Sequence, residues 1–303
     1  MHSMPELARS FSCLVVLVLA FGHTVPCTAQ VTGGSGAGYT MPDTEVFDVT
    51  AADDGQVYRI FVSKPSQPAP AAGFPVLYVL DANAFFAGFA GERRIEEFVK
   101  QAGGSMLVVG VGYPTEQTYE MQRRLYDFTP AWPAKMPASE VSMAALKAGG
   151  NEHFARFLLG QLRSEIARRY PVAADRQALF GHSLGGLFAL HVLYTQPTAF
   201  ESIVAASPSQ WWNDQAILSE ERAFVDRLMQ GKVVGPVSRL MLLTGERDNA
   251  VTITWDAEAL FKRLEPLSAH GLRTRFAIFD AESHATVPYR AITPTMRFAA
   301  GVP

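Results

Sequence analysis

A serine flanked by glycines offers the clearest chemistry in the sequence. The pentapeptide Gly181-His182-Ser183-Leu184-Gly185 has the Gly-x-Ser-x-Gly spacing of a nucleophile elbow, in which a tight strand-to-helix turn lifts the serine hydroxyl above the sheet. An apolar run precedes it, and a helix-like run beginning with Gly186 follows, which is the context that this motif requires. The sequence therefore predicts Ser183 as a nucleophile and the Leu184 N–H, at the start of the helix, as an oxyanion donor.

A serine nucleophile needs a general base, and the base needs a group that orients it. Of the seven histidines, only His284 follows the last expected strand at its carboxyl end, in the chain order serine, acid, histidine. His182 is next to the nucleophile, but we expect the tight turn to aim its side chain elsewhere. The sequence therefore predicts His284 as the base.

The acid should follow the preceding strand, where two carboxylates are available. Asp248, three residues after Gly245, is the predicted acid, since a buried carboxylate holds the imidazole in the correct tautomer. Glu246, Asp214 and a dyad without a close acid stay open as alternatives. The backbone N–H of Ala82, directly after another apolar run, is the predicted second oxyanion donor.

Apolar, β-rich runs predict eight strands that would position these residues. Two form an antiparallel hairpin and six are mostly parallel, at residues 44–50, 57–62, 76–80, 106–112, 177–180, 202–206, 239–244 and 273–279. Helices are expected between them, at residues 92–101, 152–169, 183–194, 214–230 and 255–269. The expected fold class is α/β, with a mostly parallel eight-stranded sheet flanked by helices. Ligands of such sheets bind at the carboxyl ends of the strands.

The segment 114–150 does not fit a simple crossover between strands. It is long and irregular, and it contains Pro130, Pro133, Pro137 and Trp132. Such a segment is typical of a functional loop, so we expect a lid inserted over the site. The remaining length and the hydrophobic content of 48% suit one large domain over residues 44–303.

The first thirty residues predict export. Residues 11–22 form an apolar run of signal-peptide length, and Cys27-Thr28-Ala29 supplies small residues for cleavage after Ala29. The mature protein would then be periplasmic or secreted, without a membrane partner, and would start with a flexible leader over residues 30–43. Cys13 and Cys27 both leave with the signal peptide, so neither a thiol nucleophile nor a disulfide is expected.

The net charge and the motifs of the sequence argue against several classes of binding partner. A formal net charge of −3 supplies no basic field, so nucleic acid is not an expected partner. The sequence holds no cluster with metal-ligand spacing and no phosphate-binding motif, so neither a metal nor an organic cofactor is expected. A small-molecule ester remains the expected substrate.

With these residues placed, the chain resembles α/β-hydrolases of the putative esterase family, nearest to periplasmic siderophore esterases that cleave trilactone catecholates such as enterobactin and its glucosylated form. The resemblance covers residues 44–303. It rests on the elbow and on more specific blocks, which are Val79-Leu80-Asp81-Ala82-Asn83, Val111-Gly112-Tyr113, Arg123-Arg124-Leu125-Tyr126-Asp127-Phe128-Thr129-Pro130, Ala206-Ser207-Pro208-Ser209-Gln210-Trp211-Trp212 and Ser283-His284.

The resemblance implies further roles. It makes Ser183 the nucleophile and His284 the base, and it places Arg123 or Arg124 beside the substrate, where a guanidinium could hold an anionic acyl group or a free or ferric catecholate. The expected pocket is completed by the aromatic residues Tyr113, Trp211 and Trp212. Family members often have glutamate where Asp248 stands, and some have been described as Ser-His dyads.

The leading hypothesis is an exported serine carboxylesterase that works through a Ser183 acyl-enzyme, and the resemblance makes a siderophore trilactone its candidate substrate. An acyltransferase, or a feruloyl or acetyl esterase of the same fold, is the enzymatic alternative. A ligand-binding protein that has lost activity is the alternative from another class, and retention of Ser183 and His284 in the expected order argues against it.

Overall fold

The fold is described by a computed structural model, which covers residues 39–133, 145–248 and 257–302. Residues 41–303 group as one compact unit. The predicted signal peptide (1–29) and most of the predicted leader (30–43) lie outside the described residues, as does the middle of the predicted lid.

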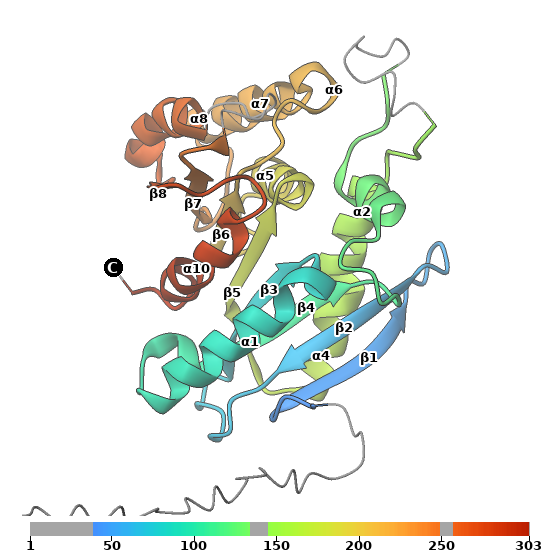
Figure 1. Cartoon of the computed structure of the whole chain (residues 1–303). Helices are drawn as coiled ribbons and strands as arrows, with labels where there is room; N and C mark the ends of the chain where they lie inside the picture. Colours follow the sequence, from blue (N-terminus) through green and yellow to red (C-terminus); the bar gives the residue numbers. More distant parts are fainter. Residues whose placement is uncertain (1–38, 134–144, 249–256, 303) are drawn as a thin grey trace, which may run out of the picture. The chain divides into compact units, whose positions relative to one another are not determined.

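An eight-stranded sheet forms the centre of this unit (Figure 1). The strands are β1 (Thr44–Thr50), β2 (Val57–Ser63), β3 (Phe74–Leu80), β4 (Leu107–Gly112), β5 (Val172–His182), β6 (Ser202–Ala206), β7 (Arg239–Gly245) and β8 (Thr274–Phe279). Their order is β1-β2-β4-β3-β5-β6-β7-β8, with antiparallel pairing only at β1-β2 and β2-β4. The predicted α/β fold, with two antiparallel strands and six parallel ones, is confirmed.

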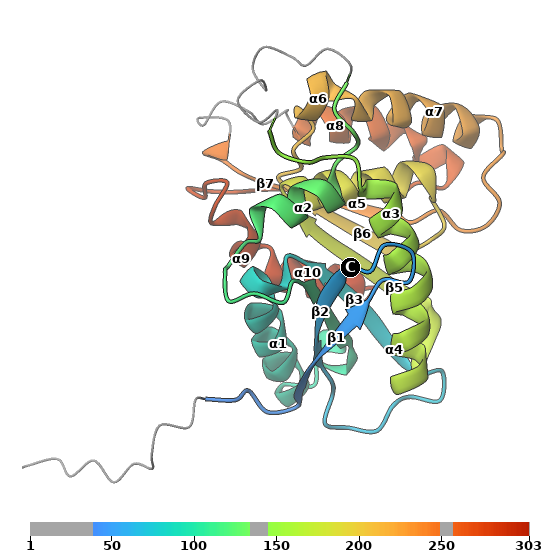
Figure 2. The same cartoon turned by 90° about the vertical axis from the view of Figure 1, so that its right-hand side faces the viewer.

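Helices cover both faces of the sheet (Figure 2). They are α1 (Ala82–Phe98), α2 (Met121–Phe128), α3 (Asn151–Arg156), α4 (Arg163–Arg169), α5 (Leu184–Thr195), α6 (Trp212–Gln215), α7 (Ile217–Met229), α8 (Ala257–Leu264), α9 (Val287–Arg290) and α10 (Ile292–Ala299). One hydrophobic cluster packs α1, α9 and α10 against the sheet, and a larger one packs α2, α4, α5, α7 and α8 against the opposite face. These layers leave the carboxyl edge of the parallel strands to the loops that follow them.

Helix α1 begins ten residues earlier than the sequence predicts. The expected helix started at residue 92, whereas α1 starts at Ala82, directly after β3. The first half of α1 is rich in alanine and phenylalanine, and Phe85, Phe89 and Ala90 are all buried between the sheet and α9 and α10. A helix buried on most sides lacks the polar stripe that identifies an amphipathic helix in a sequence. Its early start places the Ala82 amide at a helix N-terminus.

The described parts of the predicted lid segment are firmly attached. Helix α2 packs against α5, and its Leu125 and Phe128 lie in the core. Further along, the Gly149 N–H donates to the Thr129 carbonyl at 3.1 Å, and the Gly150 N–H donates to the Tyr126 carbonyl at 2.8 Å. These two bonds bring together the two ends of the stretch 130–148.

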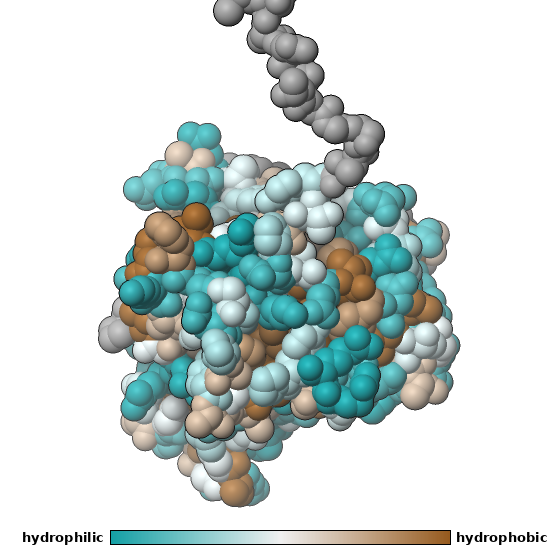
Figure 3. Space-filling view, turned by 90° about the horizontal axis from the view of Figure 1, so that it is seen from below, coloured by the Kyte–Doolittle hydropathy of each residue, from teal (hydrophilic) through white to brown (hydrophobic). Residues whose placement is uncertain are grey.

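No helix among the described residues is both long enough and apolar enough to cross a membrane. The face seen from below shows hydrophilic residues interspersed with small hydrophobic patches (Figure 3).

Candidate active site

The nucleophile elbow is a turn of a single residue. β5 ends at His182 and α5 begins at Leu184, so Ser183 alone makes the turn, with φ 59° and ψ −118°. Such a conformation is costly for a residue with a side chain and persists only where the surroundings enforce it. The turn also brings Gly181 against the first turn of α5, where a Cβ on Gly181 would lie 2.0 Å from the Gly185 carbonyl oxygen. The elbow therefore requires glycine at residue 181.

This contact predicts different outcomes for the two glycines of the motif. Gly181→Ala should lower the free energy of unfolding by about 3 kcal/mol or more, because its methyl group meets backbone that cannot move aside. Gly185→Ala is the matched control, since its Cβ would meet only ordinary contacts of 3.5 Å or more, and we expect a change below about 1 kcal/mol. Thermal unfolding of both variants measures this, and equal melting temperatures would contradict the close approach.

His284 reaches the nucleophile from the loop after β8. Its Nε2 lies 2.9 Å from Ser183 Oγ, and its Nδ1 lies 3.2 Å from Asp248 Oδ1. The structure thus brings together the serine, histidine and aspartate that the sequence singles out. With the proton of the neutral imidazole on Nδ1, facing the carboxylate, Nε2 is free to accept the serine proton.

Asp248 is buried but kept ionised. Its Oδ2 accepts hydrogen bonds from the Ser207 hydroxyl, from Thr244 Oγ1 at 2.9 Å and from the Gly245 N–H at 3.1 Å. Burial alone would raise the pKa of this carboxyl, but His284 and these three donors hold its pKa well below the usual range. A permanent negative charge therefore faces the histidine.

The alternative acids are placed differently. Glu246 accepts a hydrogen bond at 2.8 Å from the backbone N–H of Ala281. Asp214 lies in α6, beyond the loop that follows β6. Of the three carboxylates considered from the sequence, the structure places Asp248 against the His284 ring.

His182 corrects one sequence expectation. Its ring does not point away from the site but lies against the His284 ring, with centroids 4.7 Å apart. β5 stays extended through His182, so this side chain shares a sheet face with Phe180, and both rings contact Phe85. Burial, with the nearby His284 and Arg124, lowers the pKa of His182 to about 3. His182 is therefore a neutral packing surface for the base.

The two predicted oxyanion donors begin the helices that follow two neighbouring strands. Leu184 is the first residue of α5 and Ala82 the first of α1, so neither amide has a partner within its own helix. β3 and β5 are adjacent parallel strands, and Gly185 lies against Leu80 and Asp81 at their carboxyl ends. Two helix N-termini thus meet beside Ser183, where negative charge is stabilised.

A buried ion pair holds the start of α1. Arg124 Nε donates to Asp81 Oδ1 at 2.9 Å, and Arg124 Nη2 donates to Asp81 Oδ2 at 2.9 Å. Both residues are almost fully buried. Asp81 takes a left-handed conformation, with φ 53°. A two-point pair of this kind fixes orientation as well as distance. Arg124 thus contacts the oxyanion loop, which is the turn at Asp81 that precedes the donor Ala82. Its predicted role beside the substrate stays a prediction.

Arg123 and Tyr113 meet in a second buried cluster. The Arg123 guanidinium lies 5.0 Å from the centroid of the Tyr58 ring and 5.1 Å from that of Tyr113. It also lies 3.9 Å from Asp127 Oδ2. The Tyr113 hydroxyl donates to Asp127 Oδ2 at 3.1 Å. Burial raises the pKa of Asp127 to about 7. The Tyr113 amide also donates to Asn83 Oδ1 at 2.9 Å, which ties the end of β4 to α1.

The loop after β6 carries functional contacts that the sequence reasoning did not assign. Ser207 donates to Asp248, and Ser209 Oγ lies 3.1 Å from Ser183 Oγ. The signal was present, because Ser-Pro-Ser directly follows a strand at the carboxyl edge. The predicted aromatic residues continue this loop: Trp211 is half-buried, and Trp212 is buried with its ring 4.1 Å from that of Trp132.

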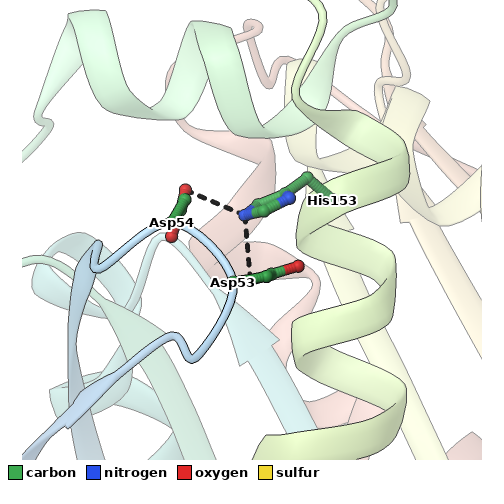
Figure 4. A group of neighbouring side chains, drawn as sticks. All are labelled: Asp53, Asp54 and His153. Carbon is green, nitrogen blue, oxygen red and sulfur yellow. Dashed lines mark ion pairs between the residues drawn. The ribbon is translucent and has the colours of Figure 1, made fainter.

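Away from the triad, three side chains of types that can bind metal ions lie close together (Figure 4). Asp53 and Asp54, in the turn between β1 and β2, point toward His153 of α3, and the three could each offer an atom to a metal ion. His153 Nε2 lies 3.1 and 2.8 Å from the two carboxylates, while Arg156 lies 3.1 Å from His153 Nδ1. Arg156 can only donate to His153 Nδ1, and its positive charge beside the cluster disfavours a bound cation.

Comparison with known proteins supports the α/β fold and action on ester bonds. The family model described as "Putative esterase" matches residues 54–272. The ferri-bacillibactin esterase BesA of Bacillus subtilis is 37% identical over 277 residues, which cover 90% of this chain and 94% of that protein. The siderophore enterobactin esterase of Emericella nidulans is 34% identical over 227 residues, covering 72% of this chain and 74% of that protein. Among solved structures, the BES protein from Bacillus cereus has a TM-score of 0.79 at 33% identity, covering 88% of this chain and 99% of that one.

Proposed function

The chain belongs to the Putative esterase family and acts on ester bonds, and we propose that it is an exported siderophore esterase that works through an acyl-enzyme on Ser183. The observation that carries the mechanism is the 2.9 Å contact between His284 Nε2 and Ser183 Oγ. The support for the substrate class comes from the relatives, which are named for siderophore ester hydrolysis.

In the first half of the proposed reaction, Ser183 Oγ bonds to the ester carbonyl carbon while its proton passes to His284 Nε2. The carbonyl oxygen becomes an oxyanion that the amides of Leu184 and Ala82 stabilise. The bond between carbon and the alkoxy oxygen then breaks, and His284 protonates the leaving alcohol. Asp248 stabilises the imidazolium throughout, because it stays ionised.

In the second half, water attacks the acyl carbon and gives a proton to His284. The bond between the acyl carbon and Ser183 Oγ breaks, and His284 returns the proton to the serine. A carboxylic acid leaves, and the resting triad is restored without any cofactor.

The half-buried Trp211, on the loop that contacts Ser183, supports an aromatic substrate such as a catecholate. Trp211 follows Ser209 by two residues, and the Trp212 N–H donates to the Ser209 carbonyl at 3.2 Å, so the tryptophans are joined to the loop that contacts Ser183. The exposed part of the Trp211 ring can stack on a catechol ring, whereas Trp212 is buried and packs on Trp132. The proposed substrate is therefore a trilactone catecholate, free or bound to iron.

Loss of the nucleophile tests this proposal directly. Ser183→Ala should keep its melting temperature and lose about 10³-fold or more in kcat on a catecholate trilactone, because covalent catalysis is removed while binding and the oxyanion amides remain. Mass spectrometry of the linear products measures the activity. The native enzyme should favour the trilactone over feruloyl and p-nitrophenyl esters, and a preference for the feruloyl ester would reject the siderophore assignment.

Paired carboxamide substitutions test the acid. Asp248→Asn should lower kcat by about tenfold or more, because the amide cannot supply the charge that stabilises the imidazolium. Glu246→Gln is the matched control and should leave kcat within about twofold, since Glu246 is bonded to a backbone amide away from the histidine. A larger loss in Glu246→Gln would reassign the acid, and no loss in either variant would favour a Ser-His dyad.

Export is proposed on the apolar run 11–22 and the small residues before Gln30. We expect full-length protein expressed in a bacterial host to be recovered from the periplasm or medium with its N-terminus at Gln30. Intact-mass measurement checks this, and recovery of the uncleaved chain in the membrane fraction would instead indicate a retained anchor.

A further inference from the structure

Ser209 is a buried serine that touches the reacting oxygen. Its side chain is 1% exposed, and its Oγ lies 3.1 Å from Ser183 Oγ. Its backbone N–H donates to the Ser183 carbonyl at 3.0 Å, so the main chain holds the two residues together independently of the hydroxyl. The Ser209 hydroxyl is thus buried within hydrogen-bond distance of the nucleophile.

The direction of this hydrogen bond follows from the single hydroxyl hydrogen on Ser183. His284 Nδ1 faces the ionised Asp248 and carries the ring proton, so Nε2 is an acceptor and takes the hydrogen of Ser183. Ser183 Oγ then has only lone pairs to offer to Ser209. The Ser209 hydroxyl must therefore donate to Ser183 Oγ in the state that is ready to react.

We propose that Ser209 is a catalytic residue whose hydroxyl donates a hydrogen bond to Ser183 Oγ, which holds the serine in its reactive rotamer and stabilises the charge on this oxygen. This proposal rests on the proposed serine mechanism. When the acyl carbon–Oγ bond breaks in deacylation, the electron pair goes to Ser183 Oγ while His284 delivers the proton. Ser209 keeps its own proton throughout and stabilises the oxygen at the moment when its negative charge is greatest.

Ser207 has a separate role in the same loop. Its hydroxyl donates to Asp248, so it acts through the acid and not on the nucleophile. The Ser209 hydroxyl, in contrast, contacts Ser183 Oγ itself.

The test is Ser209→Ala, which keeps the backbone hydrogen bond and removes only the hydroxyl. We expect kcat to fall by about three- to tenfold, with KM and the melting temperature unchanged. The second-order rate of Ser183 labelling by a fluorophosphonate should fall by a similar factor. Ser202→Ala is the matched control, because Ser202 is also buried on β6 and its hydroxyl has no hydrogen-bond partner among the described residues.

The outcomes separate this proposal from the one it rests on. If Ser209→Ala matches Ser202→Ala in kcat and labelling rate, Ser209 has no catalytic role. If its melting temperature or the fraction of protein that can be labelled drops with the activity, the role is structural and the proposal fails. If Ser183→Ala, assayed in parallel, stays active, the serine mechanism itself is wrong.

Discussion

The turn at Ser183 is the constraint on which the rest of the site depends. A single left-handed residue reverses the chain from strand to helix, and this is possible only because Gly181 presents no side chain to the α5 backbone. The same turn exposes the serine oxygen and aims the α5 amides at the reacting centre. Strain, nucleophile and oxyanion stabilisation therefore arise from one local geometry, and the surrounding core must be rigid enough to enforce it.

The second requirement is a negative charge kept in a buried place. Ionising Asp248 there would cost considerable free energy without its three hydrogen-bond donors, of which two lie at the end of β7 and one in the loop after β6. The loop after β6 serves both ends of the triad, since Ser207 contacts the acid and Ser209 contacts the nucleophile. The neutral ring of His182 adds a packing surface for the base without adding charge.

Local patterns in the sequence predicted much of this arrangement. The strands were predictable because short apolar runs bounded by turns are typical of a buried parallel sheet. Ser183, His284 and Asp248 could be proposed from their positions after strands. The start of α1 was missed because a buried helix shows no amphipathic stripe, and the orientation of His182 was wrong because β5 extends further than expected. The pairing of Arg124 with Asp81 joins residues 43 positions apart, so no local pattern reports it.

The closure of the stretch 130–148 has a consequence for how this enzyme can diversify. Hydrogen bonds from the Gly149 and Gly150 amides hold its two ends together. The preceding helix, α2, is bonded through Arg124 to the oxyanion loop. For a loop whose ends are already joined, the entropic cost of closure grows only slowly with length, by about 0.6 kcal/mol for each doubling. A change of length within this stretch therefore adds little entropic cost to the closed arrangement. The catalytic amides of Ala82 and Leu184 lie outside the stretch, so its length and the geometry of the reaction centre are set by separate parts of the chain.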